Sequence, residues 1–96
     1  MERTKYIIVL EYGIESIREG IPNIVEMLNS IGKTVQLTTH SFMMLSVDTA
    51  VVIRDAIKNS PFDIESIFVA EVDSPAAWRS LVADNNDVKT FLRNEL

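Results

Sequence analysis

Residues 6–13 read Tyr-Ile-Ile-Val-Leu-Glu-Tyr-Gly, and they predict the strand around which the rest of the fold is arranged. Five strand-forming residues follow one another without a polar break, and a glycine ends the stretch, a pattern typical of a strand buried within a sheet. We therefore expect a central strand over residues 5–12. Its carboxyl end carries Glu11, and a carboxylate at the rim of a sheet can reach solvent, a metal ion or a partner.

The rest of the chain alternates between helical and extended patterns of apolar residues. Pro22 suits the first turn of a helix, Gly32 suits a helix end, and Asp48 is a good N-cap for a second helix. We expect, in chain order, a polar loop over 13–20, a helix from near Ile21 to Gly32, strands over 33–39 and 42–47 with His40 and Ser41 at the bend between them, a helix from Asp48 to Ser60-Pro61, and a strand over 64–72.

This order of elements predicts an α+β fold of the ferredoxin-like type. Each helix must cross over so that its flanking strands lie parallel, which gives a four-stranded antiparallel sheet with two helices on one face. We expect this domain to span residues 1–82, including a short helix over 76–82, and a helical tail over 83–96 that packs on the domain or on a partner chain. The second face of the sheet is expected to remain bare and to favour dimerisation.

Composition limits the classes of protein that fit. The chain has 96 residues, a net charge of −5, one histidine and no cysteine. It is therefore a single domain without disulfides or thiolate metal sites, and its whole surface is not adapted to nucleic acid. The apolar run near the amino end is too short for a signal peptide or a membrane span, so we expect a soluble, cytoplasmic protein with no membrane contact.

Four stretches together resemble a known family. Residues 9–13 read Val-Leu-Glu-Tyr-Gly, residues 41–45 read Ser-Phe-Met-Met-Leu, residues 48–57 form a helix that follows a strand, and residues 67–72 are followed by Ala-Trp-Arg-Ser-Leu at 77–81. In order and spacing these are similar to the small CRISPR-associated endoribonuclease and integration-scaffold proteins, and to their relatives, the virulence-associated protein D toxins and stand-alone homologues. The resemblance covers about residues 5–82.

The resemblance implies a ferredoxin-like homodimer that acts on nucleic acid. Some members of the family cleave RNA or DNA with a metal ion held by an aspartate at the end of the first strand, and others only scaffold DNA. Glu11 occupies that position here. The resemblance therefore implies Mg²⁺ or Mn²⁺ as cofactor and Glu11 as its ligand, in a nuclease that is either active or vestigial.

Glu11 is the first candidate for a catalytic and metal-binding residue. If two chains paired with their first strands near a two-fold axis, two Glu11 carboxylates would approach each other, and Mg²⁺ needs only one or two carboxylates beside water and phosphate oxygens. The alternative is a solvated glutamate that ends a strand, as most surface carboxylates are.

His40 is the second candidate, with Ser41 beside it. A histidine can act as a general base toward a ribose 2′-hydroxyl in RNA cleavage without a metal ion. The alternative is a polar residue in an ordinary turn, since no second histidine accompanies it.

Basic residues are the third feature, because phosphate contacts rest on charge pairing. The four candidates for nucleic-acid binding are Arg18, Lys33, Arg54 and Arg79. The alternative is a solvated surface on which acidic residues predominate. For the whole protein, the alternative to a nuclease is a dimeric, non-catalytic module that binds another protein through the sheet face and the C-terminal tail.

Overall fold

The structure is a computed structural model that describes residues 3–14 and 20–72 together with Val88, and all structural statements below refer to these residues. Its elements in chain order are β1 (Thr4–Tyr12), α2 (Ile21–Ile31), β2 (Lys33–Gln36), β3 (Ser41–Ser46), α3 (Ala50–Lys58) and β4 (Ile64–Glu71). The short helix predicted over 76–82 lies outside the described residues, and so does the tail over 83–96 apart from Val88.

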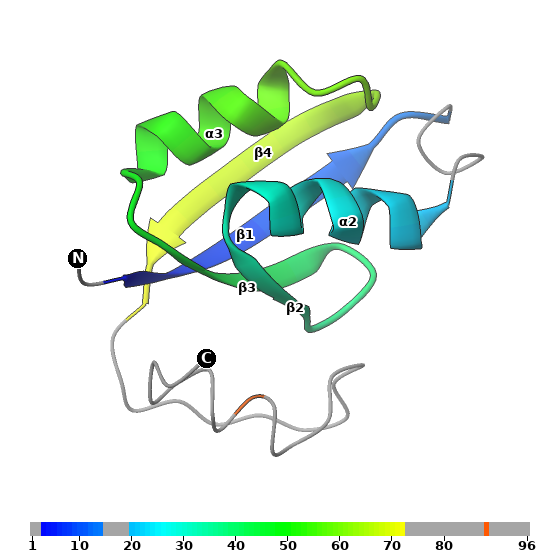
Figure 1. Cartoon of the computed structure of the whole chain (residues 1–96). Helices are drawn as coiled ribbons and strands as arrows, with labels where there is room; N and C mark the ends of the chain where they lie inside the picture. Colours follow the sequence, from blue (N-terminus) through cyan, green and yellow to red (C-terminus); the bar gives the residue numbers. More distant parts are fainter. Residues whose placement is uncertain (1–2, 15–19, 73–87, 89–96) are drawn as a thin grey trace.

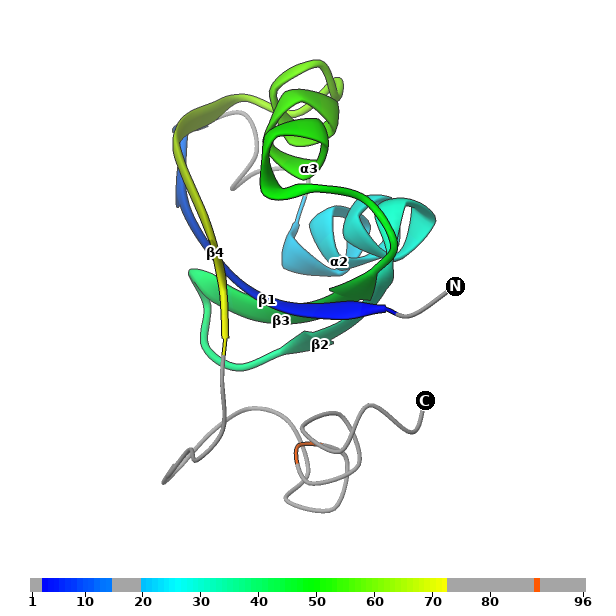
Figure 2. The ribbon, with the colours of Figure 1, turned by 90° about the vertical axis from the view of Figure 1, so that its left-hand side faces the viewer.

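The sheet has the predicted ferredoxin-like arrangement. Its strand order is β2-β3-β1-β4, and every neighbouring pair is antiparallel. Both helices lie on one face of the sheet (Figures 1 and 2). The prediction of a central first strand is confirmed, since β1 pairs with β3 on one side and with β4 on the other.

The core lies between the helices and the sheet. Alternate residues of β1 point toward the helices, as the period of a strand requires, and they are buried. Around them pack apolar residues from both helices and from β3, so that the core cluster consists of Tyr6, Ile8, Leu10, Tyr12, Ile24, Leu28, Phe42, Met44, Ile53 and Ile57.

The opposite face of the sheet, which we call the outer face, is covered over only one half. Leu37, Met43 and Leu45 form a second buried cluster with Val88, which is itself only 2% exposed. The expectation of an entirely bare face is therefore wrong for the β2–β3 half. On the β1–β4 half, Val9 is 37% exposed and Phe68 is 60% exposed.

Several predicted boundaries change by a few residues. The second strand ends at Gln36, because residues 37–40 form a tight turn in which Leu37 and Thr38 donate their N–H groups to the carbonyl of Ser41. The N-cap of α3 is Thr49, whose hydroxyl accepts a hydrogen bond from the Val52 N–H at 3.3 Å, so the prediction of Asp48 at this position is wrong.

The first helix begins as predicted. α2 starts at Ile21 with proline in its first turn, directly after Gly20, whose φ of 95° lies in the left-handed region that glycine adopts without strain. Neither α2 nor α3 is long and apolar enough to cross a membrane, and the rest of the described chain holds no such helix.

Candidate functional site at the carboxyl end of β1

Tyr12 is the centre of the candidate site. Its side chain is only 8% exposed and belongs to the core cluster, while its hydroxyl donates a hydrogen bond of 2.7 Å to the carbonyl of Thr39. The last residue of β1 is thereby connected to the turn between β2 and β3. This contact joins positions that lie 27 residues apart in the sequence.

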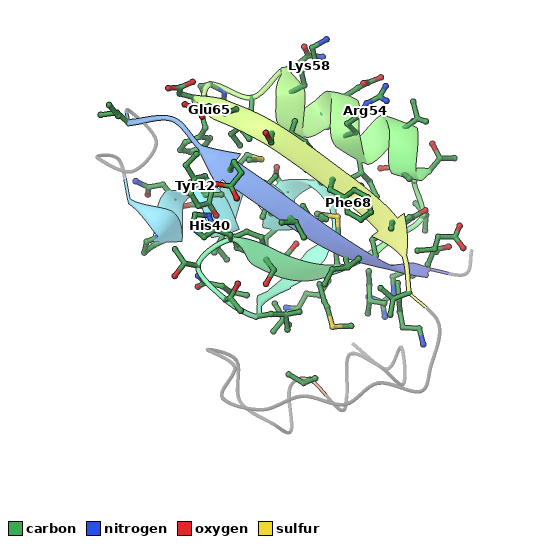
Figure 3. The ribbon with its side chains drawn as sticks, turned by 180° about the vertical axis from the view of Figure 1, so that it is seen from behind. Tyr12, His40, Arg54, Lys58, Glu65 and Phe68 are labelled. Carbon is green, nitrogen blue, oxygen red and sulfur yellow. The ribbon has the colours of Figure 1, made fainter. Side chains whose placement is uncertain are left out.

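His40 lies directly against Tyr12. The two rings are stacked, with their centroids 5.1 Å apart and their planes at 28°, and Figure 3 shows them side by side at one end of the sheet. The Nδ1 atom of His40 lies 3.0 Å from the carbonyl oxygen of Leu10. Because a carbonyl can only accept, Nδ1 carries the hydrogen, and in the neutral ring Nε2 is the nitrogen with a free lone pair.

The backbone fixes the position of His40 as well. The Leu10 N–H donates to the His40 carbonyl at 2.8 Å, so that the two residues exchange hydrogen bonds through main chain and side chain. The imidazole is nevertheless exposed to solvent. A ring held by its neighbours, with one nitrogen open, is the arrangement that a general base requires.

Ser41 is held in a different set of contacts. Its hydroxyl lies 2.6 Å from that of Thr38, and the Thr38 hydroxyl also accepts hydrogen bonds from the N–H groups of His40 and Ser41, at 3.3 and 3.1 Å. Ser41 lies opposite Val9 on the outer face, whereas the His40 ring stacks on Tyr12 on the helix-covered face. The structure therefore does not bring the side chains of His40 and Ser41 together.

Glu11 is exposed on the outer face, next to Tyr12 in sequence. It lies opposite Ser66 of β4, and the register then shifts so that Tyr12 lies opposite Ile64, which leaves Glu65 as the extra residue of a β-bulge. Burial raises the pKa of Tyr12 from 10.0 to about 12, with the negative charge of Glu11 as the second cause. The carboxylate of Glu11 and the phenol of Tyr12 therefore interact electrostatically.

A second carboxylate lies at the same end of β1. The Gly13 N–H donates to the Asp63 carbonyl at 2.8 Å, and a Cβ atom placed on Gly13 would overlap the Asp63 carboxylate. The glycine thus allows Asp63 to lie close against the chain just beyond Glu11. Within the described residues, however, no three side chains of His, Cys, Asp or Glu lie close enough together to hold a metal ion.

These donors fit a divalent ion only in part. Carboxylate oxygens are the ligands that Mg²⁺ prefers, and Mg²⁺ commonly keeps several waters and binds through one or two carboxylates. Glu11 supplies one such group. Any further ligands would have to come from water, from phosphate oxygens or from a second chain.

Of the four candidate basic residues, only Lys33 and Arg54 are among the residues that the structure describes, and these two do not lie in one groove. Arg18 and Arg79 lie outside the described residues. Lys33 begins β2 at one edge of the sheet, whereas Arg54 lies on α3 above β4, near the other edge (Figure 1). Arg54 also forms an ion pair with Asp55, with Nη2 2.9 Å from Oδ1.

Two residues of functional interest were missed at the level of sequence. Tyr12 interacts with Glu11, His40 and Thr39. Nothing in the sequence around Tyr12 indicates that it contacts the turn between β2 and β3. Phe68 lies opposite Val9 on the outer face, and the period-two alternation of the fourth strand would have placed it there.

No protein-family model, curated protein or solved structure matches this chain in the comparisons made.

Proposed function

We propose that the protein is a homodimeric, nucleic-acid-associated protein that cleaves RNA at the end of β1, with His40 as general base. Glu11, the candidate metal ligand, lies at the same end of β1 but on the outer face of the sheet. The observation that carries this proposal is the orientation of the His40 ring. Its Nδ1–H is used by the Leu10 carbonyl and its face by Tyr12, and among the described residues none bonds Nε2 of the exposed imidazole, which leaves that nitrogen for a substrate.

The chemistry follows from that one nitrogen. Nε2 of His40 takes the proton of a ribose 2′-hydroxyl, the 2′-oxygen forms a bond to the adjacent phosphorus, and the bond from phosphorus to the 5′-oxygen breaks. The 5′-oxygen takes a proton from solvent. The products are a 2′,3′-cyclic phosphate and a 5′-hydroxyl, and a positioned base of this kind accelerates proton transfer by roughly 10²–10⁴-fold.

Glu11 would add a metal-dependent contribution to the proposed cleavage. Its exposed carboxylate would hold Mg²⁺ or Mn²⁺ together with phosphate oxygens of the RNA, and a bound ion would stabilise negative charge on the phosphate. The two contributions differ in their requirement for a divalent ion, since His40 acts without one.

The experiment compares the wild-type protein with the variants His40→Gln and Glu11→Gln on labelled single-stranded RNA, with Mn²⁺ or with a chelator. If His40 is the base, cleavage persists in the chelator, falls roughly 100-fold or more in His40→Gln, and yields a 2′,3′-cyclic phosphate. If Glu11 holds an essential ion, cleavage is lost both in the chelator and in Glu11→Gln.

Two controls make the assay specific. A substrate with a single 2′-deoxyribose blocks the His40 route at that step only, and Glu26→Gln removes an exposed carboxylate on α2, outside the proposed site. Cleavage that survives in both active-site variants, or no cleavage of varied RNA and DNA, would overturn the proposal.

One observation favours a second candidate, a non-catalytic module that binds another protein. The outer face carries an apolar patch, the β1–β4 patch, in which Val9 lies opposite Phe68 and Ile7 lies opposite Ala70. Phe68 is exposed over 60% of its surface, and large exposed aromatic groups commonly anchor protein interfaces. Figure 3 shows Phe68 on the face of the sheet turned away from the helices.

This candidate predicts that Phe68→Ser loses binding to the protein partner and that the wild-type protein hydrolyses neither RNA nor DNA. A protein partner captured by the wild-type chain should bind Glu11→Gln equally well and Phe68→Ser at least tenfold more weakly, a loss of about 1.4 kcal/mol. Equal binding by both variants would exclude the β1–β4 patch as the contact surface.

A further inference from the structure

β4 is an edge strand of the sheet. The strand order places it beside β1 alone, and no other described strand lies beyond it (Figure 2). An edge strand presents a row of N–H and C=O groups that can pair with another strand. β4 is eight residues long, which is enough for a continuous ladder with a partner.

The ladder to β1 determines which of these groups face outward. The Val72 N–H donates to the Lys5 carbonyl at 2.9 Å, so Val72 and, along β4 as far as the bulge, Ala70, Phe68 and Ser66 direct their backbone groups toward β1. In an antiparallel ladder the direction alternates from residue to residue. Ile67, Val69 and Glu71 therefore direct their N–H and C=O groups toward the open side.

The centre of β4 lacks the features that usually prevent pairing at an edge, which are confined to its two ends. Natural edge strands are protected by proline, by lysine or by a charge in the middle of the strand. β4 contains neither proline nor lysine, and its centre is the apolar run Ile67-Phe68-Val69-Ala70. Its one irregularity is the bulge at Glu65, close to one end.

The sequence of β4 is nearly symmetric about Phe68. Residues 64–72 read Ile-Glu-Ser-Ile-Phe-Val-Ala-Glu-Val, so the residues at equal distances from Phe68 are similar in size, and all except Ser66 and Ala70 also share polarity. When a strand pairs antiparallel with a second copy of itself about a two-fold axis through Phe68, these residues lie opposite one another: Phe68 with Phe68, Ile67 with Val69, Ser66 with Ala70 and, where the bulge begins, Glu65 with Glu71.

We propose that β4 pairs in this register with β4 of a second copy of this chain, so that the two sheets become one continuous sheet. The inference deepens the homodimer of the proposed function, but it rests on β4 and α3 and not on His40 or Glu11. A stacked or edge-to-face pair of Phe68 rings lies on the axis, where cross-strand aromatic pairs contribute to stability.

A hollow at this edge fits the same register. It has a volume of about 130 Å³ and is lined by Ala50, Val51 and Arg54 of α3 and by Val69 of β4. Ile67 and Val69 face the helix side of the sheet, where both pack partly against the core. The partner's Ile67 would lie opposite Val69 and enter the hollow, where it would cover Val51, which is 56% exposed.

The glutamates oppose the pairing. Glu65 would lie opposite the partner's Glu71 at each end of the joined strands, and like charges directly opposite one another are destabilising. We therefore expect a dimer held by its centre, with the two ends contributing little.

Single cysteines test the register, because the chain has no cysteine of its own. Phe68, Ser66 and Ala70 would all lie in pairs that are not hydrogen-bonded across the new ladder, where Cα atoms are about 4.5 Å apart and a disulfide can form. On mild oxidation, Phe68→Cys should form a disulfide-linked dimer. Ser66→Cys and Ala70→Cys should each remain uncrosslinked alone and should crosslink to each other when mixed.

The crosslinking experiment has a control variant, and three of its possible results would contradict the proposed pairing. Glu26→Cys, on the exposed side of α2, should remain uncrosslinked under the same oxidation. A monomeric wild-type protein in light scattering, crosslinking of Ser66→Cys with itself, or absence of the mixed Ser66–Ala70 disulfide would each overturn the proposal. The Ser66 and Ala70 pair keeps the test valid even if Phe68→Cys folds poorly.

A backbone substitution distinguishes edge pairing from contact through the outer face. Val69→Pro removes an outward N–H that the monomer's own ladder does not use, while Val69→Ala removes similar side-chain packing and keeps the N–H. Edge pairing predicts that Val69→Pro dissociates the dimer about tenfold more readily than Val69→Ala does. Equal dissociation of the two variants would overturn edge pairing, and neither result depends on RNA cleavage.

Discussion

The imidazole of His40 stacks on the phenol of Tyr12, with ring centroids 5.1 Å apart, and this contact joins the end of β1 to the turn that precedes β3. Two hydrogen bonds support it, from the Tyr12 hydroxyl to Thr39 and between His40 and Leu10. The proposed base is thus held by the core and not by a loop alone. A side chain positioned in this way loses little entropy when a substrate binds.

Tyr12 should ionise later than an ordinary tyrosine. Burial and the charge of Glu11 raise its pKa to about 12, so in an absorbance titration the difference between wild type and Tyr12→Phe should have a midpoint near 12. Glu11→Gln should lower that midpoint without returning it to 10.0, because burial is the larger cause. An unchanged midpoint in Glu11→Gln would contradict the electrostatic contact.

The same shift predicts how stability depends on pH. Between pH 10 and about 12 the unfolded chain loses the Tyr12 proton while the folded chain keeps it, so the free energy of unfolding should fall as pH rises through this range. Tyr12→Phe should show a shallower decline. Denaturant titrations of both proteins at several pH values measure the difference. If the free energy of unfolding falls equally with pH in both proteins, the prediction is wrong.

Thr49, and not Asp48, should stabilise the start of α3. Thr49→Ala removes the hydrogen bond from the Val52 N–H, and the loss of an N-cap costs about 1 kcal/mol. Asp48→Ala is the matched control. The backbone carbonyl of Asp48 accepts a hydrogen bond from the Tyr6 hydroxyl, and alanine keeps that carbonyl. Chemical denaturation should show a larger loss in the free energy of unfolding for Thr49→Ala than for Asp48→Ala. The reverse order would indicate that Asp48 is the N-cap.

Gly32 should not tolerate a methyl group. Its φ of −168° is open to any residue, but a Cβ atom there would lie 2.6 Å from the Leu45 carbonyl oxygen and 2.8 Å from Cγ of Met44. Since the nearest atom belongs to the backbone of β3, Gly32→Ala should lower the free energy of unfolding by roughly 1–3 kcal/mol. Gly20→Ala offers a contrast, because there the cost comes from a φ of 95° and not from crowding.

The sequence predicts the sheet and its helices because their patterns are local. Alternation along β2 and helical spacing before Gly32 need only neighbouring residues, and the order of the elements then leaves few ways to connect them. The stacking of His40 on Tyr12 could not be predicted in this way. It depends on how far the turn after Gln36 reaches over the end of β1, which is a tertiary contact.

Alternation would have corrected one point, and a second lay beyond the reach of any local pattern. His40 and Ser41 are adjacent, so their side chains leave an extended chain on opposite faces, which argues against a joint site. The covered half of the outer face is different. Val88 lies more than forty residues from Leu45 in sequence, and nothing in the local pattern of either residue indicates that they meet.

Val88 and Phe68 should respond in opposite ways to truncation, because they occupy the covered and the uncovered half of the outer face. Val88 is 2% exposed among Leu37, Met43 and Leu45, so Val88→Ala removes buried methyl groups and should lower the free energy of unfolding by about 1–2 kcal/mol. Phe68 is 60% exposed, so Phe68→Ala should change the stability of a single chain little, while it weakens the dimer. Unfolding measured over a range of protein concentrations separates the two effects, since only the Phe68 variant should reduce the dependence on concentration. A large loss for Phe68→Ala at the lowest concentration, or none for Val88→Ala, would contradict the division of this face into a covered and an open half.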